Sequence, residues 1–265
     1  MPKLSIITIN LNNVEGLRRT VDSVVGQIYR DFEWIVVDGG SADGSRELIE
    51  EYSDRITWWV SEPDSGIYNA MNKGILASHG EYLLFLNSGD HLYNENVLSQ
   101  VVPRLLDKDF YVGEELQGDV YFSPNIKSRI FIFAKLSTGS LPHQSTFINR
   151  RVFAKYGLYR EDMHCVSDWA LFYKALIVGN ATSEWLNFII SVFDSHGISR
   201  TAISLAESER ESVFAEMPNV DSAVRFYYEN YEIVEALREY DFAFFLFRVY
   251  FYFYRKWKNL RQRFR

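Results

Sequence analysis

The sequence predicts an α/β protein with a mainly parallel sheet flanked by helices. Short apolar runs bounded by turn residues are typical of strands that are buried on both faces of a parallel sheet. The clearest is Tyr82–Asp90, Tyr-Leu-Leu-Phe-Leu-Asn-Ser-Gly-Asp. Segments with apolar residues at helical spacing lie between these runs, and strands that alternate with helices predict right-handed βαβ crossovers.

The alternation of strands and helices occupies about the first hundred residues. The predicted strands are Leu4 to Ile9, Phe32 to Val37, Ile56 to Ser61 and the run that begins at Tyr82. The predicted helices are Val14 to Gln27, Ser45 to Tyr52, and a third that begins near Gly66 and ends near Ser78. Ligands of open α/β sheets bind beyond the carboxyl ends of the strands, so the residues that follow each strand are the candidates for a site.

The composition is that of a globular domain. The 265 residues are 47% hydrophobic and 24% charged, which is enough for a sizeable core. Cys165 is the only cysteine and forms no internal disulfide, which fits a reducing compartment. The first residues turn polar too soon for a signal peptide, and no run of about eighteen apolar residues predicts a spanning helix.

Two carboxylates close predicted strands, Asp38 after the second and Asp90 after the fourth. Neither G-x-G-x-x-G nor G-x-x-x-x-G-K-[ST] occurs, so the sequence offers no dinucleotide or P-loop phosphate cradle. A carboxylate at such a strand end can bind ribose or base groups, or hold Mg²⁺ or Mn²⁺. The alternative is that both are turn and capping residues. Two of them at corresponding strand ends favour the binding role.

Four motifs in order make the first hundred residues resemble a family 2 glycosyltransferase with the GT-A fold, of the bacterial polysaccharide-biosynthesis type. The motifs are Ser5–Asn10 (SIITIN), Val37–Gly44 (VDGGSADG), Ser61–Gly74 (SEPDSGIYNAMNKG) and Gly80–Asp90 (GEYLLFLNSGD). The resemblance implies inverting transfer of a sugar from a nucleotide-diphosphate donor to an acceptor hydroxyl, usually with a divalent metal.

The resemblance also implies roles for single residues. Thr8 and Asp38 would line the base and ribose pocket, Asp64 and Asn72 would complete the nucleotide site, and Asp90 would bind the metal, Mn²⁺ or Mg²⁺. Many relatives have Asp at the position of Gly39. In relatives the fourth motif is usually richer in carboxylates, whereas Asn87, Ser88 and Gly89 leave Asp90 as its only anion.

The second hundred residues resemble the acceptor half of such enzymes. His143, in Leu141–Ile148, would contact the acceptor or the diphosphate, or else form a structural hydrogen bond. Asp168 matches the general base of the family, although Ser167 stands where a Glu usually precedes it. An acceptor hydroxyl is a poor nucleophile unless a positioned carboxylate takes its proton. The alternative role for Asp168 is a helix N-cap.

Two further features lie near the site. In the segment Val166–Leu176, a helix with Asp168 at its amino-terminal end would turn Leu171, Ala175 and Val178 toward the core. His196 stands in Ser195–Ser199 (SHGIS), which resembles the loop that follows the catalytic helix in the family, and would be a second metal ligand. The alternative for His196 is a turn residue beside Gly197.

The end of the chain differs in charge from the rest. Residues 242–265 contain seven basic residues and no acidic one, and the remaining residues carry a net charge of −14. The aromatic run from Phe242 to Tyr254 is too short to span a bilayer, so it predicts a helix in the headgroup region. The alternative is a core helix with a solvated basic end.

The prediction is one α/β domain with a nucleotide-sugar-binding half (residues 1–100), an acceptor-binding and catalytic half (101–200), and a helical extension (201–265). We expect a cytoplasmic enzyme, peripheral on the inner face of the cell membrane, with a saccharide or lipid-linked acceptor and no nucleic-acid partner. Two alternatives are a nucleotidyltransferase and a catalytically lapsed, membrane-bound assembly subunit.

Overall fold

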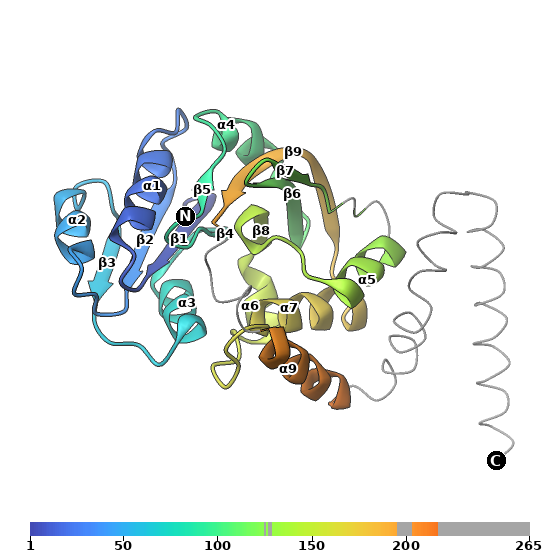
Figure 1. Cartoon of the computed structure of the whole chain (residues 1–265). Coiled ribbons are helices and arrows are strands. Elements are labelled where there is room, and N and C mark those ends of the chain that lie inside the picture. The colour runs from blue at the N-terminus through green and yellow to red at the C-terminus, as the bar shows by residue number, and fades with distance from the viewer. Residues whose placement is uncertain (125, 127–128, 195–202, 217–265) are drawn as a thin grey trace, which may run out of the picture. The chain divides into compact units, whose positions relative to one another are not determined.

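The computed structural model describes residues 1–124, 126, 129–194 and 203–216, and Figure 1 shows how their helices and strands are arranged. Nearly all of them belong to one compact unit, Met1–Val213. His196 and the basic aromatic tail, residues 242–265, lie outside the described residues. Within the described ranges, no helix has the length and apolar character needed to cross a membrane.

The first half alternates strands and helices as predicted. Its elements are β1 (Leu4–Asn10), α1 (Val14–Val25), β2 (Glu33–Asp38), α2 (Ser45–Glu51), β3 (Trp58–Ser61), α3 (Ile67–Ala77) and β4 (Tyr82–Phe85). β1 pairs in parallel with β2 and β4, and β2 pairs in parallel with β3. The register sets Asn10 beside Asp38 and Asp38 beside Ser61. The carboxyl ends of these strands therefore meet at one edge.

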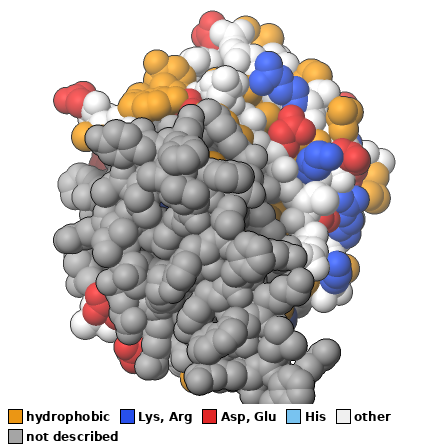
Figure 2. Space-filling model, turned by 90° about the vertical axis from the view of Figure 1, so that its right-hand side faces the viewer, with side chains coloured by type: hydrophobic (Ala, Val, Ile, Leu, Met, Phe, Trp, Pro, Cys, Tyr) orange, Lys and Arg blue, Asp and Glu red, His pale blue; other side chains and the backbone are white. Residues whose placement is uncertain are grey.

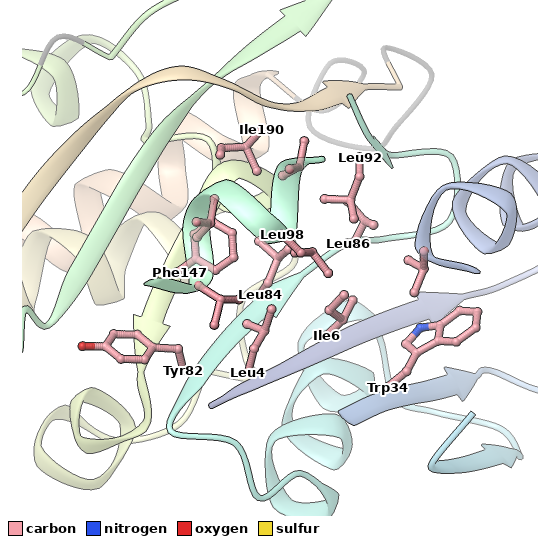
Figure 3. Packing of buried hydrophobic residues seen from close by; sticks show 14 of the residues in the cluster. Leu4, Ile6, Trp34, Tyr82, Leu84, Leu86, Leu92, Leu98, Phe147 and Ile190 are labelled. Carbon is pink, nitrogen blue, oxygen red and sulfur yellow. The ribbon is translucent and has the colours of Figure 1, made fainter. Parts of the chain in front are cut away.

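Helices cover both faces of this parallel part. On one face, Leu4 and Ile6 of β1 share a buried cluster with Leu17 of α1 and Leu48 of α2. Figure 3 shows side chains of β1, β2 and β4 in this cluster, Trp34 among them. The opposite face is covered by α3, which packs on β1 and β2. β1, β2 and β4 are buried along their whole length, so apolar residues occupy both faces of these strands.

Close packing of α3 on β1 depends on Gly74. A Cβ added at Gly74 would overlap Cγ2 of Ile7, which is fully buried. We expect Gly74→Ala to lower the free energy of unfolding by about 1–3 kcal/mol, since overpacking outweighs the better helix propensity of alanine. Urea unfolding measures the change. The control is Leu76→Ala, two residues further along the helix, where the side chain is 72% exposed. Equal stability of Gly74→Ala and wild type would contradict this packing.

The second half adds antiparallel strands, so the sheet is mixed as a whole. Its first elements are β5 (His91–Leu92), α4 (Val97–Val101), η1 (Val102–Arg104), β6 (Phe110–Gln117), β7 (Val120–Phe122), α5 (Arg129–Thr138) and η2 (His143–Ser145). The elements that follow are β8 (Thr146–Asn149), α6 (Arg150–Tyr156), α7 (Ser167–Phe172), η3 (Tyr173–Val178), β9 (Ser183–Phe193) and α9 (Ile203–Ala215). Among the described residues the sheet has nine strands, in the order β3-β2-β1-β4-β8-β6-β9-β5 with β7 beside β6. This arrangement confirms the predicted α/β class.

One core prediction is wrong. Leu171 and Ala175 are buried as expected, but Val178 is 47% exposed. The reason is that α7 continues into η3, a π-helical segment whose wider turns take more residues than α-helical turns. The smaller rotation per residue leaves Val178 off the buried face.

Figure 2 shows side chains of the described residues on one face of the molecule, turned by 90° from the view of Figure 1. Where side chains are described on this face, Lys and Arg alternate with Asp and Glu. Charges of both signs therefore lie side by side on the visible described part of this face.

Candidate active site

Asp38 closes the parallel edge of the sheet. Its fully buried carboxylate accepts hydrogen bonds from Asn10 Nδ2 (2.7 Å), Ser61 Oγ (2.6 Å), Ser41 Oγ (2.6 Å) and the backbone N–H groups of Ser41 (3.0 Å) and Gly40 (3.2 Å). Burial raises the pKa of Asp38, but the hydrogen bonds from Ser41, Ser61 and Asn10 outweigh it, so the pKa lies below its ordinary value. Asp38 is therefore an ionised carboxylate that also holds the turn after β2.

Asn10 is a site candidate that the sequence reasoning missed. It is the last residue of β1 and is 4% exposed. Its amide nitrogen donates to Asp38 Oδ1, while its Oδ1 has no hydrogen-bond partner among the described residues. A buried polar atom without a partner is rare and marks a place where a ligand or water can donate. Its position could have identified it as a candidate, because Asn10 is the last residue of β1 and lies beside Asp38, the last residue of β2.

Thr8 and Asp64 lie in different surroundings. Thr8 is fully buried, and its hydroxyl accepts a hydrogen bond from Trp34 Nε1 (3.1 Å). Asp64 is half-buried and accepts from the backbone N–H of Gly66 (2.9 Å). A Cβ added at Gly39 would lie 2.6 Å from Asp64 Oδ2. The carboxylate of Asp64 thus takes up the space that a side chain at position 39 would need, and that residue is glycine here.

Asn72 ties α3 to the segment that follows α6. Its Nδ2 donates to the backbone oxygen of Tyr159 (2.9 Å) and to Glu161 Oε1 (2.8 Å), and its Oδ1 accepts from Tyr159 N (3.0 Å). The side chain is 4% exposed. In this structure the amide of Asn72 holds the protein's own backbone, and its nucleotide-binding role stays a prediction.

The turn that carries Asp90 is fixed by α1 and by the end of β9. Thr20 Oγ1 of α1 donates to the backbone oxygen of Asp90 (2.7 Å) and accepts from Gly89 N (3.0 Å). Gly89 has a φ of 108°, a conformation that favours glycine, and a Cβ there would lie 2.5 Å from Asp194 Oδ2. The backbone N–H of Asp194 donates to Asp90 Oδ1 (2.8 Å). The structure therefore sets Asp194, which the sequence reasoning missed, against Asp90.

Asp90 lies where negative charge accumulates. It is 4% exposed, and burial raises its pKa to about 8. The hydrogen bond from Asp194 N lowers the pKa, while the negative charges of Glu115 and Asp194 raise it. Arg19 forms an ion pair with Asp194, with 2.8 Å between Nη2 and Oδ2, and the Arg19 side chain is 50% exposed. Burial therefore favours the protonated form of Asp90, and the negative charges of Glu115 and Asp194 act in the same direction.

A divalent cation fits this place only with help from further oxygen atoms. In the described part of the chain, no three His, Cys, Asp or Glu side chains converge closely enough to hold a metal ion. Asp90 and Asp194 are two carboxylates, the kind of ligand that Mg²⁺ and Mn²⁺ prefer, and water or substrate phosphates commonly supply the rest. His196, the other predicted metal ligand, lies outside the described residues.

Asp168 and His143 come together with the Asn87 end of the same turn. Tyr68 of α3 donates its hydroxyl hydrogen to Asp168 Oδ1 (2.9 Å), and His143 Nδ1 lies 3.7 Å from Asp168 Oδ2. The other ring nitrogen, His143 Nε2, lies 3.2 Å from Asn87 Nδ2. The two ring nitrogens of His143 thus face Asp168 on one side and Asn87 on the other. One imidazole therefore links Asp168 to the turn that carries Asp90.

The charges of these groups follow from burial. Burial lowers the pKa of His143, although Asp168 raises it, so the net pKa is below the ordinary value and the ring is neutral at pH 7. Burial and the charge of Asp168 raise the pKa of Tyr68 well above its usual range, so its hydroxyl remains a donor. The N-cap of α7 is Val166. Asp168 contacts Tyr68 and His143 from the first turn of the helix, so the N-cap alternative is wrong.

The arrangement has three parts along one edge of the sheet. Asn10 and Asp38 end β1 and β2, Asp90 and Asp194 meet beyond β4, and Asp168 faces His143. A carboxylate held on one oxygen by a tyrosine, with its other oxygen toward a neutral imidazole, is suited to accept a proton from a hydroxyl group.

Comparison with known proteins gives one family and one fold. The family model described as "Glycosyl transferase family 2" matches residues 5–165. An uncharacterized glycosyltransferase of Mycobacterium tuberculosis strain H37Rv is 34% identical over 210 residues, which are 74% of this chain and 77% of the relative. A PGL/p-HBAD biosynthesis glycosyltransferase of the same strain is 26% identical, over 74% of this chain and 78% of the relative.

Solved structures share the fold at low sequence identity. S. aureus TarS 1-349 in complex with UDP-GlcNAc has a TM-score of 0.62 and 18% identity over 76% of this chain. The mannosyltransferase PcManGT from Pyrobaculum calidifontis, in complex with GDP-Man and Mn²⁺, has a TM-score of 0.57 and 17% identity over 74% of this chain. This chain spans 61% and 58% of those two chains, and 36% of the longer S. aureus TarS chain.

Proposed function

This chain belongs to glycosyl transferase family 2, and from that premise we propose an inverting transfer of a sugar from a nucleotide-diphosphate donor to a saccharide or lipid-linked saccharide. The proposed role is in cell-surface polysaccharide synthesis. The observation that carries the proposal is Asp168, which faces His143 and is connected through it to the turn of Asn87–Asp90. Family membership favours glycosyl over nucleotidyl transfer.

The proposed donor site is the edge formed by the ends of β1 and β2. Asp38 can accept hydrogen bonds from the ribose or base, and the unpartnered Oδ1 of Asn10 offers a second acceptor beside it. Asp64, half-buried next to Gly39, borders the same edge. Solved relatives of the same fold were obtained with UDP, UDP-GlcNAc and GDP-Man, which supports a nucleotide-sugar donor here. Thr8 and Asn72 would complete the donor site from buried positions.

The proposed chemistry is a direct displacement with one general base. The acceptor hydroxyl oxygen attacks the anomeric carbon of the donor sugar and gives its proton to Asp168. A bond forms between that oxygen and the anomeric carbon while the bond from this carbon to the diphosphate oxygen breaks, and the nucleoside diphosphate leaves. Tyr68 holds Asp168 in place, and neutral His143 contacts the acceptor. A single displacement of this kind inverts the anomeric configuration.

We propose that Asp90 and Asp194 hold a divalent cation, Mn²⁺ or Mg²⁺, together with oxygens of the donor diphosphate. The cation would offset the negative charge of the departing diphosphate. The mannosyltransferase PcManGT, which shares the fold, was solved in complex with Mn²⁺. The negative charges of Asp194 and Glu115 near Asp90 support a cation at this point. His196 remains the proposed protein ligand beyond them.

The remaining parts of the proposal concern the whole chain. The nucleotide-binding and acceptor-binding halves would meet near residue 100, and residues 201–265 would form the extension. The basic aromatic residues 242–265 would keep the protein at the inner face of the cell membrane, close to a lipid-linked acceptor. The supporting observation is the charge contrast between this segment and the rest of the chain.

The direct test is release of nucleoside diphosphate from a panel of UDP-, GDP- and dTDP-sugars with Mn²⁺ or Mg²⁺. We expect turnover of at least one donor, acceleration by the matching acceptor, and loss of turnover in EDTA with recovery on adding Mn²⁺. Folding is checked by circular dichroism in the same buffers. A folded protein that releases nucleoside diphosphate from no donor in the panel would contradict the proposal and favour the lapsed assembly subunit.

A further inference from the structure

A carboxylate of α9 holds the backbone just before α7. Glu209 Oε1 accepts from the backbone N–H of His164 (2.7 Å), and Oε2 accepts from those of Cys165 (3.0 Å) and Val166 (3.2 Å). Three consecutive N–H groups thus converge on one side chain that is more than forty residues away in sequence. Hydrogen bonds to an ionised acceptor are shorter and stronger than neutral ones. This contact fixes the chain two residues before Asp168.

The next residue of α9 makes a second, independent contact with α7. The guanidinium of Arg210 lies over the ring of Trp169, 5.2 Å from its centroid, and Nη2 donates to the backbone oxygen of Gly139 (3.3 Å). Trp169 is 1% exposed and donates its Nε1–H to the backbone oxygen of Leu136 (2.7 Å). Figure 1 shows α9 lying alongside α7. Adjacent residues of α9 therefore hold the chain on both sides of Asp168.

The other end of the same segment is held by α3. Asn72 binds both backbone groups of Tyr159, and Asn69 Nδ2 donates to Glu161 Oε2 (2.9 Å). The segment from Tyr159 to Val166 is thus fixed by α3 at its start and by α9 at its end. Tyr68, which donates to Asp168, also belongs to α3. The base is therefore aligned by two helices that approach it from different parts of the sequence.

We propose that Glu209 is a positioning residue for the general base and that α9 forms part of the catalytic architecture. The proposal rests on the proposed function, in which Asp168 takes the acceptor proton. Glu209 acts through the backbone of residues 164–166 and does not contact the substrates. Displacement of a catalytic group by about 1 Å can cost on the order of 10²-fold in rate. The contact therefore affects catalysis more than donor binding, since Asp38 and Asp90 lie on other elements.

Cys165 provides a reporter of the contact. It is the only cysteine, is partly buried, and its backbone N–H is one of the three that donate to Glu209. Burial raises the pKa of the Cys165 thiol, and the charges of Glu209 and Asp168 raise it further. Removing the charge of Glu209 should lower this pKa and loosen the segment. Both changes increase the rate at which a thiol reagent modifies Cys165.

The test compares Glu209→Gln with Glu207→Gln in the full chain. The control removes the same charge from the same helix at an exposed position. We expect Glu209→Gln to lower kcat for transfer about 10–100-fold, to keep KM for the donor within about twofold, and to speed Cys165 modification at pH 7.5 about tenfold. Glu207→Gln should match wild type in all three. A purely structural role would reduce donor binding and kcat together.

Two results would overturn the inference. One is wild-type kcat and wild-type thiol reactivity in Glu209→Gln. The second result would come from hydrogen exchange of the wild-type protein. We expect the amides of residues 164–166 to be protected from exchange as well as those of α7. If these amides exchange as fast as those of exposed loops, the contact with Glu209 is not made. If instead Asp168→Asn keeps full transfer, the base assignment on which this inference rests fails, and this outcome is separate from the result for Glu209. The proposed function itself fails only if the folded wild-type protein transfers no sugar.

Discussion

Asp168→Asn should lower kcat for sugar transfer by about 10²–10⁴-fold, the range that general base catalysis contributes. An asparagine oxygen can still accept the hydrogen bond from Tyr68, so the side chain keeps its place. What the variant loses is the oxygen that takes the acceptor proton, on the side of His143. Affinity for the nucleoside diphosphate should stay within about twofold, because no group of the proposed donor site is changed.

The measurement pairs acceptor-dependent release of nucleoside diphosphate with calorimetric titration of the same nucleotide. The matched control is Asp162→Asn, six residues earlier, where the carboxylate is 65% exposed and forms an ion pair with Arg160. This control should behave as wild type, since an exposed ion pair contributes little. If Asp168→Asn transfers sugar at the wild-type rate, the base is another group.

Asp90→Asn should have opposite effects on function and on stability. The variant loses an anionic ligand of the proposed cation, and we expect transfer to fall by about 10²-fold or more. Without a cation, however, an ionised Asp90 destabilises the folded state, because burial raises the pKa of its carboxyl group to about 8. A neutral amide of nearly the same shape removes this destabilising charge.

The sign of the pH effect follows from linkage. Between the unfolded pKa near 3.8 and the folded pKa of about 8, the folded protein keeps a proton on Asp90 that the unfolded chain releases. Stability therefore falls as pH rises through this window and levels off above it, by on the order of 5 kcal/mol in all. In EDTA at pH 8, Asp90→Asn should raise Tm by about 5–15 °C relative to wild type.

Thermal unfolding in EDTA from pH 5 to pH 9 measures this difference. Asp22→Asn on α1, where the residue is exposed, serves as the control and should follow the wild-type curve. Adding Mn²⁺ should stabilise wild type more at pH 8 than at pH 6, since cation binding displaces the proton. Parallel pH profiles for wild type and Asp90→Asn would show that Asp90 does not titrate in this window.

The first half of the fold could be predicted from sequence because its signals are local. β1 was expected to end at Ile9 and ends at Asn10, and β2 was expected to end at Val37 and ends at Asp38. Continuous apolar runs identify such strands without knowledge of their partners. The second half pairs strands that are distant in sequence, such as β4 with β8 and β5 with β9, and no local pattern contains that information.

The candidate site divides in the same way. Asp38, Asp90 and Asp168 lie in or directly after recognisable segments, and the sequence alone is enough to single them out. Asp194 becomes visible only when the end of β9 lies against Gly89. Glu209 lies in a helix that looks merely acidic in sequence, and its contact with residues 164–166 is tertiary. Side chains that position others through backbone contacts leave no local signal.

The claim that one carboxylate drives a direct displacement is tested most directly by the stereochemistry of the product. Proton NMR of the glycoside formed with a turned-over donor reports the anomeric configuration through its coupling constant. With Asp168 as the only base, the new linkage should have the configuration opposite to that of the donor from the earliest time points. A product that retains the donor configuration would exclude a single back-side displacement and would contradict the mechanism proposed for Asp168.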